Sequence, residues 1–66
     1  MIDPYRVVVT RQDQYLVAEV PGVEGASTAA GNPEELNFRV RDCLAAALQL
    51  PEGAEADLEL LWEWPA

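Results

Sequence analysis

The side chains that could do chemistry in this 66-residue chain are mostly carboxylates. Three of them, Asp57, Glu59 and Glu63, lie close together near the C-terminus, and Mg²⁺ or Ca²⁺ would take oxygen ligands of this kind. Their spacing matches no loop that wraps an ion, so the cluster is interpreted as a solvated acidic edge, with a metal site as the alternative. We therefore expect no metal and no other cofactor.

The residues that serve nucleophilic and general acid–base catalysis are sparse. The sequence contains no histidine, which excludes His-based triads and the commonest metal ligand. Ser27 is the only serine and has no activating base within sequence reach. Glu34 and Glu35 are adjacent, so they would point to different sides of a helix, and no glycine-rich phosphate loop is present. We expect no catalytic residues and no enzyme, with a residual nuclease as the alternative.

The single cysteine, Cys43, rules out an internal disulfide framework and fits a reducing compartment. It falls in the apolar stripe of a predicted helix, so we interpret it as a small core residue rather than a nucleophile. No leader-like segment and no apolar run of membrane-spanning length is found. The length fits one small domain, residues 1–66, and we expect a cytoplasmic protein without a membrane partner.

The formal net charge is −8, from twelve acids against four arginines and no lysine. Residues 52–66 hold five acids and no base, a net of −5, and residues 1–51 hold seven acids and four arginines, a net of −3. Such a surface repels nucleic-acid phosphates and attracts basic partners. We expect no direct binding to nucleic acid. The charge alone is compatible with a basic protein partner and with a merely solubilising surface.

Alternating apolar residues predict the strands that must position these side chains. The first two form an antiparallel hairpin around the polar turn Gln12–Gln14, and Pro21 with Gly22 ends the second. The third is built from small residues that suit a sheet edge, and the fourth is rich in Leu and Trp. The predicted strands are Tyr5–Arg11, Tyr15–Val20, Ala26–Ala30 and Asp57–Trp64.

The apolar period changes from two to 3.6 after Gly31, which predicts a helix from Glu34 to about Leu50. Asn32 is a suitable cap and Pro33 fits the first helical position. Phe38 projects from the side opposite to the core, where it is either an incidental exposed residue or an anchor for a partner. The residues expected in the buried stripe are Leu36, Val40, Cys43, Leu44 and Ala47.

The order β-β-β-α-β predicts an α+β fold in which one helix packs on a four-stranded mixed sheet. A right-handed crossover makes the last strand parallel to the third. If this connection skips two positions, the last strand lies beside the first and the sheet order is 3-2-1-4. One helix covers only one face of such a sheet, so the other face is open.

The open face combines apolar residues with acidic and polar neighbours. It is interpreted either as a docking surface or as an ordinary solvated face dotted with β-branched residues. The residues that we expect to contact a partner, on this face and on the helix, are Val8, Val17, Glu19, Phe38, Glu59, Leu61 and Glu63.

Taken together, these elements resemble the N-terminal domain of HicB-type antitoxins from bacterial toxin–antitoxin systems. The resemblance covers Tyr5 to Trp64. At Glu24-Gly25-Ala26 the chain departs from the Pro-Gly-Cys-like corner that is usual in the family. The shared features are the strand Tyr5–Arg11, the turn at Asp13, Tyr15-x-x-Ala18-x-Val20-Pro21, Gly25-x-x-Thr28, Gly31 and the helix start Glu34-Glu35-Leu36.

The resemblance implies a degenerate, partial RNase H-like fold that has lost its catalytic carboxylates. It also implies that the chain neutralises a small, basic, RNA-cleaving toxin of the HicA-like kind by covering its surface. Full-length members append a DNA-binding module after the last strand; this chain ends at Ala66, and we expect no such module. The alternative is a self-associating structural or regulatory module, a homodimer held by edge strands or by the open face.

Overall fold

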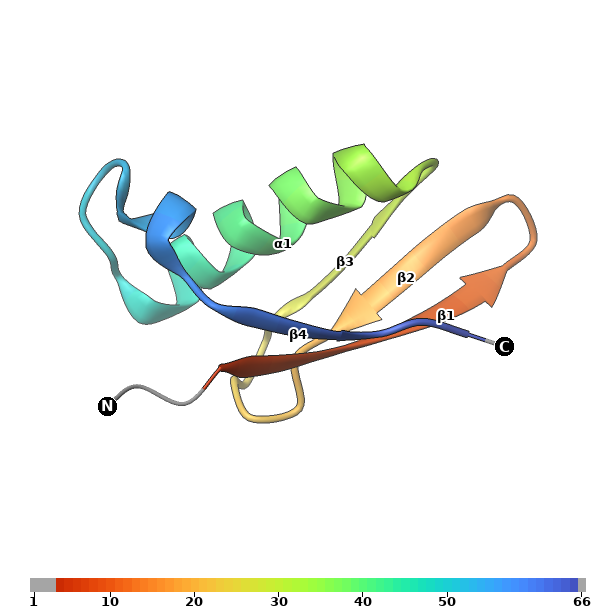
Figure 1. The fold of residues 1–66 in the computed structure, drawn as a ribbon, viewed down its shortest axis with the longest axis horizontal. Helices are drawn as coiled ribbons and strands as arrows, with labels where there is room; N and C mark the ends of the chain where they lie inside the picture. The colour runs from red at the N-terminus through yellow and green to blue at the C-terminus, as the bar shows by residue number, and fades with distance from the viewer. Residues whose placement is uncertain (1–3, 66) are drawn as a thin grey trace.

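A computed structural model describes residues 4–65 of the chain. The sheet has the order β3-β2-β1-β4, in which β1 is antiparallel to β2 and parallel to β4 (Figure 1). This arrangement confirms the predicted α+β fold with one helix and the strand order 3-2-1-4. The elements are β1 (Tyr5–Gln12), β2 (Tyr15–Glu19), β3 (Ser27–Ala30), α1 (Pro33–Leu48), the 3₁₀ helix η1 (Ala54–Asp57) and β4 (Leu60–Glu63).

The β1–β2 hairpin is tighter than its polar sequence suggested. Gln12 pairs with Tyr15, so the loop contains only Asp13 and Gln14, and Gln12 belongs to the ladder rather than to the turn. Asp13 has a φ of 55°, a left-handed conformation that a short polar side chain tolerates well. The tight loop fixes the register of the two strands.

Helix α1 begins as the sequence predicted. The side-chain oxygen of Asn32 accepts a hydrogen bond of 2.8 Å from the Glu35 amide, and Pro33 occupies the first turn. The helix ends at Leu48, two residues before its predicted end, because Gln49 turns into the left-handed conformation with a φ of 55°. The Gln49 amide then donates to the Ala46 carbonyl, which closes the last turn.

The core lies between α1 and the sheet. Leu36, Val40 and Leu44 are buried as predicted, and Cys43 is half-buried against the same cluster. The prediction for Ala47 is wrong, because this residue is exposed and Leu48 packs on the core in its place. The helix meets the sheet along an i, i+4 row, and the position that follows Leu44 in that row is Leu48.

Helix α1 covers only part of the sheet. Its backbone approaches β3 and β2 but neither β1 nor β4. Side chains from β1 and β4 complete this uncovered flank of the core, among them Tyr5, Leu60 and Trp62. Trp62 stacks on Trp64, with 5.2 Å between the ring centroids and 11° between the ring planes. An aromatic pair therefore closes the core where the helix does not reach.

The last strand is shorter than predicted. The sequence placed a strand over Asp57–Trp64, but β4 spans Leu60–Glu63 because η1 precedes it. The Arg41 guanidinium donates hydrogen bonds to the carbonyl oxygens of Glu55 (3.1 Å) and Leu58 (2.8 Å). These two bonds hold η1 against the helix, so the chain enters the sheet only at Leu60.

Candidate functional site

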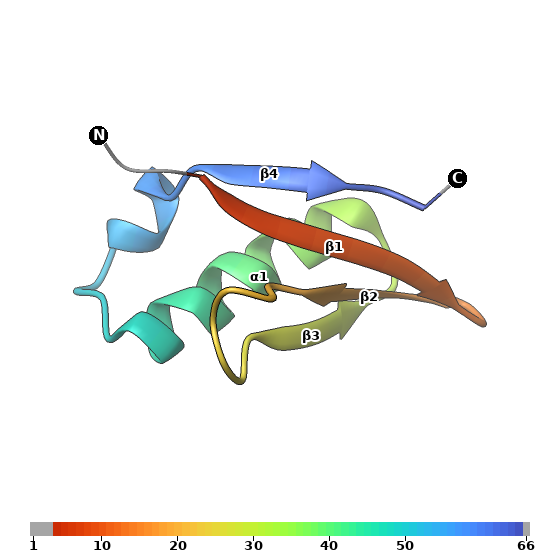
Figure 2. The same cartoon turned by 90° about the horizontal axis from the view of Figure 1, so that it is seen from below.

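Among residues 4–65, no helix lies over the sheet face opposite α1, and Figure 2 looks onto this open face. Its side chains come from alternate residues of the strands, as the pleat requires. In the ladder, Val8 lies directly between Glu19 of β2 and Glu63 of β4, and Thr10 lies opposite Val17. The face thus has an apolar centre with a carboxylate on each side of Val8.

Two exposed apolar side chains mark the ends of the open face. Leu61, beside Arg6, is 55% exposed, and Tyr15, beside Gln12 at the hairpin end, is 60% exposed. Val8 and Val17 between them are half-buried. Large apolar side chains that stay exposed together on one face are typical of a protein-interaction surface.

Arg6 and Glu63 form a two-pronged ion pair on the open face. Arg6 Nη2 donates to Glu63 Oε1 at 3.0 Å, and Arg6 Nε donates to Glu63 Oε2. The hydrogen bond from Arg6 lowers the pKa of the Glu63 carboxyl, and the same bond raises the pKa of the Arg6 guanidinium. Glu63 is therefore ionised at neutral pH, and its charge is compensated by its neighbour.

Most of the acidic charge lies away from this face. The strand residues of the open face carry one arginine, Arg6, against two carboxylates, Glu19 and Glu63, a net of −1. The other acids of residues 52–66 fall between the end of α1 and the start of β4. They are Glu52, Glu55, Asp57 and Glu59.

The structure brings together most of the residues predicted to contact a partner. Phe38 lies apart from them, 73% exposed on α1. Glu59 lies just before β4, where its carbonyl accepts a hydrogen bond from the Tyr5 amide. The remaining five share the open face: Val8, Val17, Glu19, Leu61 and Glu63.

The predicted set omitted Arg6 and Tyr15, which also lie on the open face. Both belong to this face by the same strand alternation that identified Val8 and Val17. The alternation of side chains along the strands was therefore sufficient to place both residues on this face. The ion pair of Arg6, in contrast, depends on the β1–β4 register.

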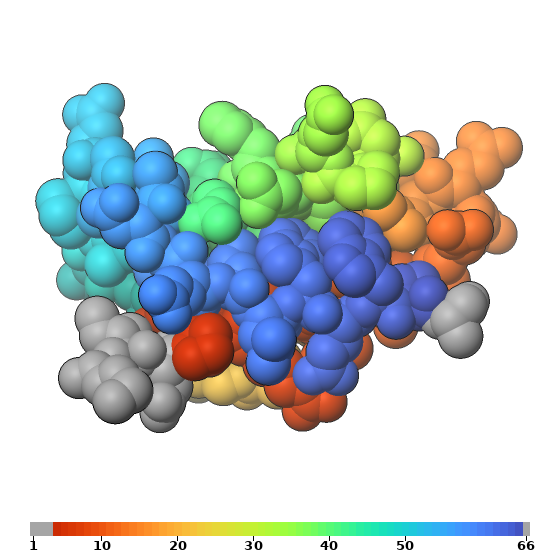
Figure 3. Space-filling model, viewed as in Figure 1, coloured from red at the N-terminus to blue at the C-terminus, as the bar shows by residue number. Residues whose placement is uncertain are grey.

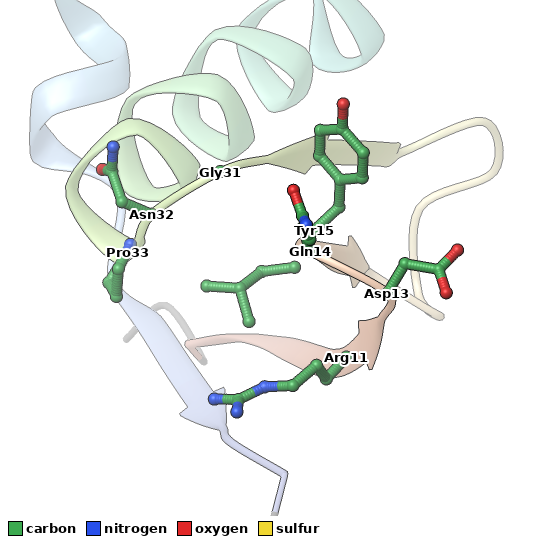
Figure 4. A pocket seen from close by; sticks show the side chains of 8 residues that line it. Arg11, Asp13, Gln14, Tyr15, Gly31, Asn32 and Pro33 are labelled. Carbon is green, nitrogen blue, oxygen red and sulfur yellow. The ribbon is translucent and has the colours of Figure 1, made fainter.

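A hollow of about 290 Å³ lies beside the hairpin (Figure 4). Arg11 borders it from β1, and Asn32 and Pro33 border it from the start of α1. The side-chain oxygen of Asn32 already caps the helix. The hollow is therefore bordered by the Arg11 side chain and by groups that already stabilise the fold, and the Asp13 side chain points away from it.

The carboxylates first considered for a metal are dispersed. Asp57 belongs to η1, Glu59 precedes β4, and Glu63 is bound to Arg6. Within residues 4–65, no three His, Cys, Asp or Glu side chains are grouped so that they could hold a metal ion.

Comparison with models of protein families, with curated proteins and with solved structures finds no match to this chain. Of the two helices in the described part of the chain, neither has the length and apolar character needed to cross a membrane.

Proposed function

We propose that this chain is a non-catalytic protein-interaction domain of the HicB antitoxin type. Its partner is a small basic protein, an RNA-cleaving toxin, which it neutralises by covering the toxin's surface with the open face of its sheet. In this proposal the domain works in the cytoplasm, requires no cofactor and does not itself bind nucleic acid. The observation that carries the proposal is the open sheet face with Tyr15 and Leu61 exposed at its ends.

The composition of the open face supports binding to a protein. A tyrosine offers a large contact area with a polar tip and loses little conformational entropy when it is immobilised. Tyr15 is such a residue, and it projects from β2, a strand held on both sides by neighbouring strands. The apolar centre at Val8 and Val17 lies on the same rigid support. A partner could therefore dock without a large rearrangement of the domain.

The electrostatics support a basic partner. The domain extends 34 Å along its longest axis and has a formal net charge of −8. Exposed charges act over about 8 Å at physiological ionic strength, so a basic protein is attracted before contact. On the open face itself, Glu19 makes no resolved side-chain hydrogen bond within residues 4–65, whereas Glu63 is paired with Arg6. We assign Glu19 as the carboxylate that meets a basic side chain of the partner.

The strand order also supports the family assignment. A sheet ordered β3-β2-β1-β4 with a single helix is the arrangement expected of the partial RNase H-like fold to which the sequence shows a resemblance.

The experiment is co-expression of this chain with the product of the adjacent gene, with cell growth and RNA integrity as readouts. The proposal expects a small basic product that arrests growth alone and is neutralised by the wild-type chain. Tyr15→Ala and Glu19→Lys should weaken this protection. Phe38→Ala is the matched control, because it removes an exposed aromatic of similar size from the helix. Protection that depends on Phe38 and not on Tyr15 would place the binding site elsewhere.

A further inference from the structure

The outer edge of β4 is an open sheet edge. Among residues 4–65 no strand pairs with it, since β4 is the last strand in the order β3-β2-β1-β4. Figure 3 shows β4, in blue, crossing the front of the molecule below the helix. An exposed edge strand offers unpaired amide and carbonyl groups to any further strand.

The register of the sheet identifies the groups that β4 presents at this edge. The Tyr5 amide donates to the Glu59 carbonyl at 2.8 Å, and Tyr5 lies opposite Leu60. In a parallel ladder, alternate residues of a strand direct their amide and carbonyl groups to the same neighbour. The backbone groups of Leu61 therefore face β1, and those of Leu60 and Trp62 face outward.

The composition of this edge gives it little protection, although β4 is only four residues long. The segment Leu60–Glu63 contains no proline, lysine or arginine, and its one charged side chain, Glu63, is compensated by Arg6. On the helix side, Trp64 is 49% exposed beside Trp62. The edge is thus both unpaired and apolar.

We propose that two copies of this chain pair through their β4 edges as antiparallel strands, about a twofold axis centred on Trp62. Trp62 then lies opposite Trp62 of the second copy, and Leu60 lies opposite Trp64 of the second copy. The outward backbone groups of Leu60 and Trp62 form the new ladder. The two sheets become one continuous sheet with both helices on the same side.

The charges of β4 select this register. Centring the axis on Leu61 would place Glu59 opposite Glu63 of the second copy, twice. A shift in the other direction, centred on Glu63, would place two glutamates directly opposite each other. The register centred on Trp62 instead places Glu63 opposite Leu61 of the second copy, and like charges directly opposite are unfavourable. The register centred on Trp62 also pairs the residues whose backbone groups face outward and whose apolar side chains are the largest.

A second copy fits this edge because the edge is self-complementary. A twofold interface needs one surface that matches itself, and the pairs Trp62 with Trp62 and Leu60 with Trp64 satisfy this requirement. Helix α1 stops short of β1 and β4, so the aromatic side chains of two copies meet without a helix between them. This inference does not depend on the proposed function.

Sedimentation equilibrium of charge variants at Leu61 tests the proposal. Leu61 is 55% exposed, so the folded monomer tolerates a change there. Leu61→Glu places a carboxylate opposite Glu63 of the second copy twice and should raise the dimer dissociation constant at least tenfold. Leu61→Lys should lower it or leave it unchanged. Gln14→Glu and Gln14→Lys, at the hairpin turn, are controls for net charge, and each should change the dimer dissociation constant less than threefold.

Disulfide trapping tests the register in a Cys43→Ala background. Residues 61 and 63 of the two copies form a pair without mutual hydrogen bonds, with Cα atoms about 4.5 Å apart, which a disulfide can bridge. A mixture of Leu61→Cys and Glu63→Cys chains should form the mixed disulfide in preference to either homodimer. A wild-type chain that stays monomeric to millimolar concentration, a Leu61→Glu dimer as tight as the wild type, or linkage of Leu61→Cys chains to each other would overturn the proposal.

Discussion

Arg6 and Glu63 are 57 residues apart in the sequence and are joined by two hydrogen bonds across the parallel pair β1–β4. The pair links β1 to β4 on the open face of the sheet. It also pairs one of the two carboxylates of that face, so Glu19 is the carboxylate of the face that makes no side-chain hydrogen bond among residues 4–65. Register, rather than composition, therefore determines the electrostatics of the open face.

The ion pair makes the ionisation of Glu63 dependent on Arg6. The pKa of Glu63 lies below its ordinary value of 4.5 in the folded chain, so its contribution to stability is present above the unfolded-state pKa. That contribution is lost as the pH falls through the folded-state pKa. Replacing Arg6 with Gln should raise the Glu63 pKa, measured by ¹³C NMR of its carboxyl carbon. Arg11→Gln, on the other face of β1, should leave it unchanged, and equal pKa values in wild type and Arg6→Gln would contradict the pairing.

Two arginines of α1 should differ in their effect on stability. Arg41 donates to the carbonyls of Glu55 and Leu58, whereas Arg39 makes an exposed 2.8 Å pair with Glu35. Arg41→Met should lower the free energy of unfolding by about 1–3 kcal/mol, because it leaves carbonyl groups without their donor. Arg39→Met should change it by about 0.5 kcal/mol or less. Urea denaturation followed by Trp fluorescence measures both, and similar losses would argue against the Arg41 contacts.

The cap of α1 gives a second stability test. Asn32→Ala removes the acceptor of the Glu35 amide and should cost about 1 kcal/mol. Asn32→Asp keeps an acceptor at the positive end of the helix dipole and should stay close to the wild type. Thermal unfolding monitored by circular dichroism compares the two. A loss as large for Asp as for Ala would show that the side-chain oxygen does not cap the helix.

Truncation of a buried and of an exposed residue of α1 should change the stability of the domain by very different amounts. Leu36 is fully buried, and Leu36→Ala should cost about 2–5 kcal/mol through lost burial and a cavity. Phe38 is 73% exposed, and Phe38→Ala should change stability by about 0.5 kcal/mol at most. Because a domain of this size has only about 3–10 kcal/mol of stability, Leu36→Ala should be visibly destabilised in urea. A comparable loss for Phe38→Ala would contradict the orientation of the helix.

Local residue chemistry predicted much of this fold. Asn32, Pro33 and the 3.6-residue period identified the helix start. The crossover rule identified the direction of the last strand, and the order 3-2-1-4 followed on the condition that the connection skips two positions. The start of β4 was missed because the alternation of apolar residues continues through Leu58, while the bonds from Arg41 that divert this segment depend on tertiary contacts. The prediction for Ala47 was wrong because the apolar period of the helix does not determine how the helix is tilted on the sheet.

The candidate site was predictable to the same extent. Strand alternation alone placed Val8, Val17 and Leu61 on one face. It could not show that Arg6 compensates Glu63, since that pair follows from the register of two strands at opposite ends of the chain. Strand alternation also did not show that α1 stops short of β4, so that Trp62 covers this flank of the core.

Isothermal titration of the purified chain with the product of the adjacent gene, which the account expects to be small and basic, tests the central claim most directly. The account predicts a complex that forms at micromolar concentration or below, weakens as salt is added, and is weakened about tenfold by Tyr15→Ala but not by Phe38→Ala. No binding at micromolar concentration, or equal affinities for the wild-type and Tyr15→Ala chains, would contradict an interaction domain that works through the open face.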